Sequence, residues 1–167
     1  TASDLETKQL ENFEDLQFAV PTLTFAKGAY SGSGISLRGI GNFAVGNSSS
    51  NAIGYFWNGQ TASQSGLYEA EFFDVERIEV LRGPQGTLFG SGTTGGAIQL
   101  VTKRPDAVFG GNVKVDMADY DSRRLSGAIN VPLSDNLRSR FAFASLKRDG
   151  FVTNNYNGET LDDRNTM

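Results

Sequence analysis

Apolar residues near the start of the chain recur at the spacing of a helix. Pro21 ends this run, and capping patterns occur at Ser3 with Glu6 and at Asn12 with Asp15. Three apolar residues follow the i, i+3, i+7 spacing of one helix face: Phe13, Leu16 and Val20. The first twenty residues are therefore predicted to form two short amphipathic helices.

After Pro21 the pattern changes to short apolar runs between glycine-rich loops. Asn58-Gly59 is a turn signal, and residues 41–51 are expected to form a mobile, solvent-facing loop. Residues 68–75 carry Ala70, Phe72 and Phe73 among acids, which favours a short helix. Five strands are predicted in this region: residues 22–27, 35–38, 55–58, 77–81 and 97–103.

Residues 83–96 contain six glycines and Pro84, so this segment is expected to bend sharply or to pack its backbone closely. Arg104-Pro105-Asp106 ends the following strand as a turn. We expect a boundary in the organisation of the chain at this turn.

Beyond Gly110 apolar and polar residues alternate strictly, which predicts three strands of about ten residues. The apolar positions of the three runs are Val113, Val115 and Met117; Leu125, Gly127, Ile129 and Val131; and Leu137, Phe141 and Phe143. Residues 132–136 form a short junction, whereas residues 149–167 form a long polar stretch. Short turns at one end and long loops at the other are typical of an outer-membrane barrel, but alternation alone favours a soluble antiparallel meander.

The composition excludes several classes of chemistry. The 167 residues include no cysteine and no histidine, which removes disulfides, thiolate or imidazole metal ligands and Ser-His triads. The net charge of −4 gives no net attraction to nucleic acid. No stretch approaches the roughly 18 apolar residues of a membrane helix, and Thr1 opens no signal peptide.

Three short motifs are better explained by local structure than by chemistry. Residues 90–95 satisfy G-x-G-x-x-G, but a β-rich run follows them instead of the helix that a dinucleotide site requires. The spacings of Glu69 with Glu71 and of Glu76 with Glu79 suit solvated faces. Residues 119–121 read D-Y-D, a pattern that is usually turn chemistry and only occasionally a calcium site.

Arg38 and Arg82 each end an apolar strand and precede a glycine. A guanidinium in that position is predicted to be partly buried and then needs a partner. Three interpretations stay open: an internal ion pair, for instance with Glu76 or Glu79, a surface arginine, or a functional contact.

Two longer strings identify a family. They are FDVERIEVLRGPQGTLFG at residues 73–90 and TTGGAIQLVTKRP at residues 93–105. Both closely resemble the plug domain of TonB-dependent outer-membrane receptors, and ISLRGIG at residues 35–41 resembles an upstream strand of the same family. The likeness covers about residues 15–105.

The resemblance implies an α+β plug, a small mixed β-sheet with short helices, followed by antiparallel strands of a transmembrane β-barrel that is incomplete here. Such plugs lie inside barrels of about 22 strands. Residues 1–107 would form the plug domain, and residues 108–167 the first three strands and loops of the barrel. Three strands cannot close, so the wall would be completed either by a longer receptor or by further chains.

The resemblance also implies TonB-dependent active transport across the outer membrane of a Gram-negative bacterium, without enzymatic activity or a cofactor. The plug would gate the barrel and help to bind a scarce ligand such as a ferric siderophore, cobalamin, haem or a saccharide. The implied partners are this ligand, outer-membrane lipid and TonB, and we expect the TonB-binding segment to precede Thr1. The alternative is a soluble periplasmic ligand-binding or signalling module built on a plug-like sheet, which detergent dependence would distinguish.

Site residues follow from the same resemblance. In the family, arginines of two motifs pair with glutamates on the inner barrel wall and latch the plug, and Arg38 and Arg82 match those positions. The loops near residues 27–34, 42–51 and 61–68 match the ligand-facing loops by position only. Aromatic and amide chemistry then selects six candidate ligand-binding residues: Tyr30, Asn42, Phe43, Asn51, Gln64 and Tyr68.

Overall fold

The computed structural model describes residues 1–27, 33–41, 52–62, 71–156, 158–161 and 164–166. The chain divides into two compact units, Thr1–Lys103 and Arg104–Met167. The division falls at the start of the predicted Arg104-Pro105-Asp106 turn, four residues before the boundary expected after residue 107.

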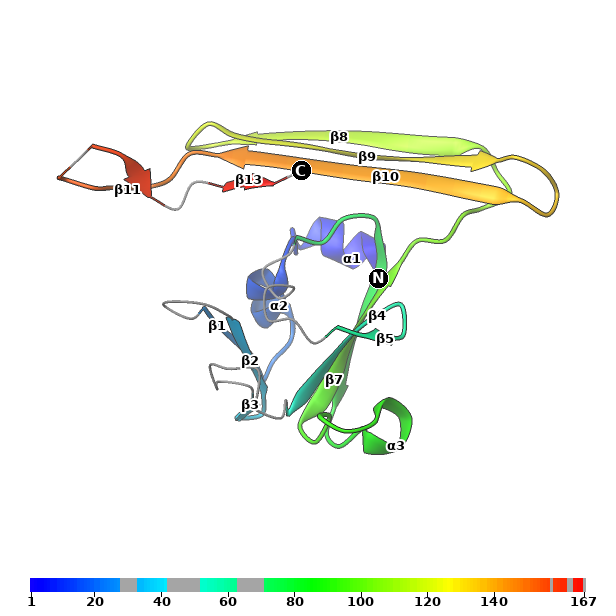
Figure 1. Cartoon of the computed structure of the whole chain (residues 1–167), viewed down its shortest axis with the longest axis horizontal. Helices are drawn as coiled ribbons and strands as arrows, with labels where there is room; N and C mark the ends of the chain where they lie inside the picture. Colours follow the sequence, from blue (N-terminus) through cyan, green and yellow to red (C-terminus); the bar gives the residue numbers. More distant parts are fainter. Residues whose placement is uncertain (28–32, 42–51, 63–70, 157, 162–163, 167) are drawn as a thin grey trace. The chain divides into compact units, whose positions relative to one another are not determined.

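Two short helices open the N-terminal unit, α1 (Ala2–Thr7) and α2 (Phe13–Ala19) (Figure 1). The predicted Asn12 cap is confirmed, because its side-chain oxygen accepts a hydrogen bond from the backbone N–H of Asp15 at 2.9 Å. The predicted Ser3 cap is wrong. The cap of α1 is Thr1, whose hydroxyl donates to the Asp4 carboxylate at 2.6 Å, so Ser3 already lies within the helix.

The strands of this unit form two sheets. The first is antiparallel, in the order β1 (Leu23–Lys27), β2 (Ser33–Leu37) and β3 (Ile40–Gly41). The second is ordered β5 (Gln60–Thr61), β4 (Ile53–Trp57), β7 (Gly96–Thr102) and β6 (Val75–Arg82). β4 and β7 run parallel whereas the other neighbours are antiparallel, so the mixed sheet of the expected plug is present.

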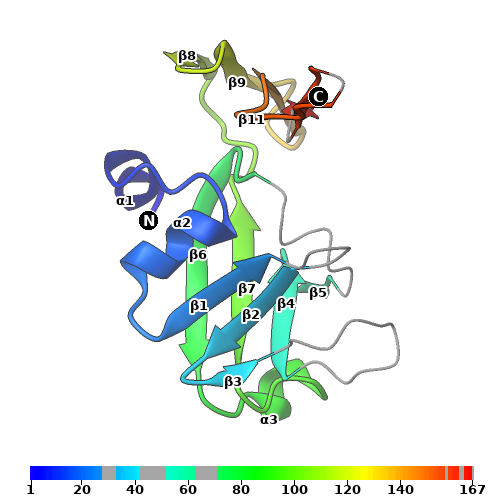
Figure 2. The same cartoon turned by 90° about the vertical axis from the view of Figure 1, so that its left-hand side faces the viewer.

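The core lies between these sheets and α2. Figure 2 shows β1 and β2 crossing in front of β6 and β7 as a separate layer. The buried core residues are Phe13, Leu16, Leu23, Ile35, Leu37, Ile53, Tyr55, Val75, Ile98 and Leu100. A single helical turn, α3 (Gly86–Phe89), adds an aromatic contact, since the Phe89 ring lies 4.7 Å from that of Phe56. The glycine-rich segment therefore contains this turn as well as bends.

Two predictions in this unit need correction or lie outside the described residues. Residues 71–74 are not helical and Val75 already belongs to β6, so the predicted helix at 68–75 is wrong for its described part. Phe72 is held instead by contacts with residues far away in the sequence. Its N–H donates to the Glu11 carbonyl at 2.6 Å, and the centroid of its ring lies 5.0 Å from the centroid of the Phe13 ring. Of the predicted loop at 41–51, Gly41 belongs to β3 and the rest lies outside the described residues.

The second unit contains the three predicted long strands: β8 (Gly110–Ala118), β9 (Ser122–Pro132) and β10 (Arg138–Arg148). They form an antiparallel meander, which confirms the strand prediction. The stretch 149–167 is not a loop throughout, because it contains three short strands: β11 (Val152–Thr153), β12 (Thr160–Leu161) and β13 (Arg164–Thr166). β13 pairs with residues 146–148 of β10 and so covers part of an edge that the sequence left open.

The register of the meander separates two faces. Directly opposed residues share a face, so Ile129 lies between Gly111 and Phe141, and Gly127 between Val113 and Phe143. The large apolar side chains of this face are exposed: Val113, Val115, Met117, Leu125, Ile129, Phe141 and Phe143. The other face carries polar side chains, among them Lys114, Asp116, Arg124, Asn130 and Arg140. No helix among the described residues is long and apolar enough to cross a membrane.

Candidate functional site: two arginines at one end of the N-terminal unit

Arg38 lies in the tight turn that joins β2 to β3. Arg38 and Gly39 have φ angles of 55° and 80°, as the two central residues of a type I′ hairpin turn require. β2 is buried along its whole length, and the N–H of Arg38 donates to the Thr22 carbonyl at 2.9 Å. A buried strand and a backbone hydrogen bond thus hold the backbone of an arginine whose side chain is exposed.

Arg82 is the last residue of β6, opposite Gly96 on β7. The chain turns directly after it, because Gly83 has a φ of 88° and its N–H donates to the Gly95 carbonyl at 3.2 Å. The side chain of Arg82 is exposed as well. Pairing of this strand end with β7 and the turn that follows it therefore fix its Cα position.

Close packing around Gly96 brings the two arginines to one end of the unit. A methyl group at position 96 would lie 2.8 Å from Leu37 Cδ1 and would clash with the Leu81 carbonyl oxygen. Leu37 precedes Arg38, and Gly96 is the strand partner of Arg82. The two sheets therefore meet at a glycine, where the residue before Arg38 packs against the strand partner of Arg82.

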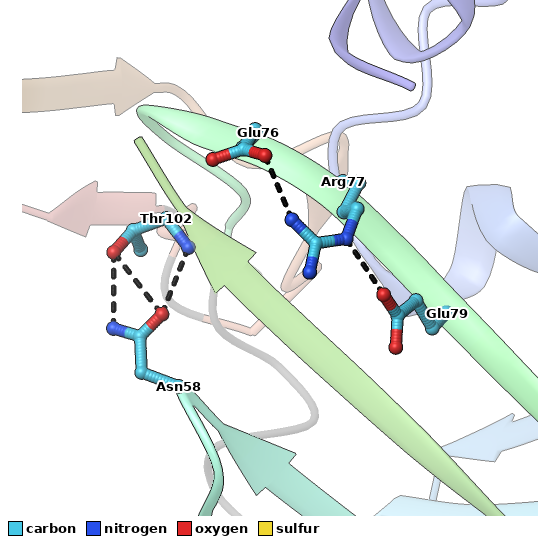
Figure 3. A network of polar contacts seen from close by, with 5 residues as sticks. All are labelled: Asn58, Glu76, Arg77, Glu79 and Thr102. Atoms are coloured by element: carbon cyan, nitrogen blue, oxygen red, sulfur yellow. Dashed lines mark hydrogen bonds and ion pairs between the residues drawn. The ribbon is translucent and has the colours of Figure 1, made fainter. Parts of the chain in front are cut away.

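The acids considered as internal partners bind a different arginine. The Arg77 guanidinium lies 2.7 Å from the Glu76 carboxylate through Nη1 and 2.6 Å from the Glu79 carboxylate through Nε (Figure 3). The hydrogen bond to Glu79 raises the pKa of Arg77 above its ordinary value, so this side chain stays charged. Within the described residues neither Arg38 nor Arg82 forms an ion pair, and the interpretation of a pair with Glu76 or Glu79 is wrong.

The prediction that Arg38 and Arg82 are partly buried is also wrong for this chain. Arg38 lies in the turn after β2 and Arg82 is the last residue of β6, so neither guanidinium is enclosed by the core. The arrangement is two exposed guanidinium groups on a rigid backbone, which suits recognition of carboxylates by paired hydrogen bonds.

The other candidate residues give no second site. Tyr30, Asn42, Phe43, Asn51, Gln64 and Tyr68 all lie outside the described residues. Gly90–Gly95 leads into β7, as expected for a segment that is not a dinucleotide site. In the described part of the chain no three His, Cys, Asp or Glu side chains gather closely enough to hold a metal ion.

Sequence reasoning missed one polar residue that the structure singles out. Asn130 is only 3% exposed and makes three side-chain hydrogen bonds with the segment that connects the two units. Its signal in the sequence is an amide in the middle of a predicted strand, where asparagine is disfavoured.

Comparisons with known proteins agree with the resemblance. The TonB-dependent Receptor Plug Domain family matches residues 1–97. The ferric enterobactin receptor of Pseudomonas aeruginosa is 36% identical over 99 residues, which cover 56% of this chain and 13% of that protein. The ferric enterobactin receptor PirA of the same species is 32% identical over 126 residues, covering 72% of this chain and 17% of that protein.

A solved structure extends the similarity to both units. The ferric yersiniabactin uptake receptor FyuA from Yersinia pestis matches with a TM-score of 0.84 and 28% identity, over 98% of this chain and 25% of that one. The chain thus spans a quarter or less of these relatives. The expected fold class is confirmed: a plug with a mixed sheet and short helices, then antiparallel strands that make up part of a barrel.

These relatives come from Gram-negative bacteria, and the outer membrane of such a bacterium is the location of this protein. The named relatives are receptors rather than enzymes. On the match to residues 1–97, more than half of its length, the chain belongs to the TonB-dependent receptor plug domain family.

Proposed function

We propose that this chain is the plug and the opening barrel strands of an outer-membrane transporter that takes up a ferric siderophore with energy supplied through TonB. One observation carries the proposal: a single siderophore receptor structure matches 98% of the chain, across both units, at a TM-score of 0.84. The relatives named as receptors for ferric enterobactin and ferric yersiniabactin support an iron-siderophore complex as the ligand class.

In this proposal the plug sheet blocks the barrel and Arg38 with Arg82 latches it. Their exposure and their lack of ionic partners among the described residues support the latch, since a guanidinium held at a rigid strand end is available to an acid elsewhere in the receptor. Tyr30, Asn42, Phe43, Asn51, Gln64 and Tyr68 remain predicted ligand contacts. TonB remains a predicted partner.

The amphipathic meander supports a membrane barrel over the alternative of a soluble periplasmic module. Seven large apolar side chains of one face are exposed, among them Val113 and Phe141 at 70% and 64%. A soluble protein rarely leaves so continuous an apolar surface in water, whereas lipid covers it without cost. Outer-membrane lipid is therefore the proposed partner of this face.

The test is iron uptake by the native host. Deleting the gene should abolish uptake of one ferric siderophore while uptake of others continues, and deleting tonB should abolish the same uptake. Restoring the gene should restore it. Normal uptake of every siderophore in the deletion strain would reject the proposed ligand class, and uptake that continues without tonB would reject the energy source.

A further inference from the structure

The last two residues of the N-terminal unit, Thr102 and Lys103, are hydrogen-bonded to the rest of that unit. The Asn58 side chain makes three hydrogen bonds to Thr102: its Oδ1 accepts from the Thr102 N–H at 3.0 Å and from the Thr102 hydroxyl at 3.3 Å, and its Nδ2 donates to that hydroxyl at 3.0 Å (Figure 3). The next N–H, of Lys103, donates to the Asp74 carbonyl at 2.9 Å. The chain is therefore still anchored to the plug sheet at Lys103.

The first residue that the second unit fixes by side-chain hydrogen bonds is Asp106. The Oδ1 of Asn130 accepts the Asp106 N–H at 2.8 Å, and its Nδ2 donates to the carbonyls of Asp106 at 2.8 Å and of Val108 at 2.6 Å. Asn130 lies on β9 and is only 3% exposed. Its hydrogen bonds hold Asp106 and Val108, the residues before β8, which no strand pairing holds.

Only Arg104 and Pro105 lie between the two anchors, and both are exposed. Proline fixes its own φ and favours extended conformations of the residue before it, so this piece is short and only a few of its backbone torsions are free to turn. Three Cα steps separate Lys103 from Asp106, which limits their separation to about 11 Å.

We propose that Asn130 is a clasp that ends the connecting segment at Asp106 and confines bending between the two units to Arg104 and Pro105. Each hydrogen bond lies within one unit or its connecting segment, so the tether holds for any arrangement of the units. The consequence for transport rests on the proposed function: while the clasp is closed, Lys103 at the end of the plug sheet stays within about 11 Å of Asp106, which Asn130 holds, so the plug can turn about Arg104 and Pro105 but its connection does not lengthen.

The test is hydrogen exchange of residues 104–109 in the intact receptor in outer-membrane vesicles. In the unchanged receptor, the Asp106 amide should be protected like the amides of β9. Asn130→Ala should speed its exchange by about tenfold or more, because all three side-chain hydrogen bonds are lost. Asn112→Ala is the matched control, since Asn112 lies on the same polar face but is exposed and opposes Ala128; it should leave the exchange unchanged.

Asn130→Asp separates a clasp from a merely space-filling residue. At neutral pH its carboxylate keeps the acceptor for the Asp106 N–H but faces two carbonyl oxygens without a donor. As the pH falls and the carboxyl is protonated, it regains one donor, so the protection factor at Asp106 should rise from pH 7 to pH 4. Two charged groups lie next to this position in both receptors: the Asp106 carboxylate, which accepts the Ala107 N–H, and Arg140, directly opposite residue 130 on β10. The unchanged receptor therefore measures their contribution, and the rise in Asn130→Asp should exceed it.

Three results would overturn the clasp: an unprotected Asp106 amide in the unchanged receptor, equal exchange in Asn130→Ala and Asn112→Ala, or an Asn130→Asp profile like that of the unchanged receptor. The first of these results is measured on the unchanged receptor, so the proposal can be rejected even if a variant fails to fold. Siderophore uptake is measured separately on the same receptors. Lost protection with normal uptake rejects the clasp alone, whereas normal protection without any uptake rejects the proposed function alone.

Discussion

At the scale of single residues, Arg82 is the sharpest test of the latch. Its backbone is fixed by pairing with Gly96, and its charge has no ionic partner in the described part of the chain. If an acid of the barrel wall binds it, Arg82→Ala leaves that acid buried and unpaired, which costs about 3–5 kcal/mol of plug stability. We expect a lower urea midpoint for plug unfolding in the intact receptor, measured by hydrogen exchange of β6 and β7.

The matched control is Arg77→Ala, five residues earlier on the same strand but already paired with Glu76 and Glu79. Exposed ion pairs of this kind contribute little to stability, so its urea midpoint should barely move. Arg82→Lys should fall in between, because an ammonium keeps the charge but not the paired hydrogen bonds of a guanidinium. Equal midpoints for Arg82→Ala and Arg77→Ala would reject the latch.

Gly96 tests the contact between the two sheets, in which Leu37, the neighbour of Arg38, packs against the strand partner of Arg82. Its φ of 150° and the nearness of Leu81 O and Leu37 Cδ1 leave no room for a methyl group. Gly96→Ala should destabilise the plug by about 2 kcal/mol or more, since backbone and a buried leucine must both shift. Gly86→Ala is the control: nothing lies within 4 Å of its added methyl, so the thermal midpoint should stay or rise slightly. Equal thermal midpoints for Gly96→Ala and Gly86→Ala would contradict the close contact at Gly96.

At the scale of elements, α2 shows how one cap supports the core. Asn12 begins the helix that carries Phe13 and Leu16 into the contact between the sheets. Asn12→Ala should cost about 1 kcal/mol in urea unfolding, because the Asp15 N–H loses its acceptor. Asn12→Ser supplies another hydroxyl acceptor and should recover most of the loss; equal losses in both variants would show that the cap contributes nothing.

The elements differ in how well the sequence predicts them, and the reason is the range of the contacts that form them. β8, β9 and β10 follow directly from alternation, since one face of each strand meets one environment over its whole length. The predicted helix at 68–75 fails because Phe72 is held by Phe13, far away in the sequence. β13 is three residues long and pairs with a strand that ended sixteen residues earlier, so no local pattern announces it.

The candidate site shows the same limit. The motifs locate Arg38 and Arg82 at strand ends, but their exposure depends on where the sheets end in space and on which arginine takes Glu76 and Glu79. Asn130 carries no motif at all, and its partners lie 22 to 24 residues earlier. A local pattern therefore predicts which residues stand at an element's end, and tertiary structure decides what they bind.

At the scale of the whole molecule, the two units differ in where their apolar side chains lie. The N-terminal unit buries its own core, with Phe13, Ile35 and Ile98 fully enclosed. The meander instead separates a polar face from an exposed apolar one, and none of its described residues belongs to the buried core cluster. This difference follows from the sequence, because helical spacing and buried runs before residue 103 give way to strict alternation after residue 110.

This difference predicts that the 167-residue chain self-associates in water without detergent. The apolar face of the meander should drive self-association in detergent-free buffer, whereas detergent micelles should yield dispersed protein. Light scattering measures the association, and thermal unfolding shows whether the dispersed protein is folded. Replacing Val115 and Phe141 with threonine and serine, on the exposed face, should reduce the association. A monomer of 18.0 kDa with a sharp thermal transition in plain buffer would contradict the assignment of this face to lipid.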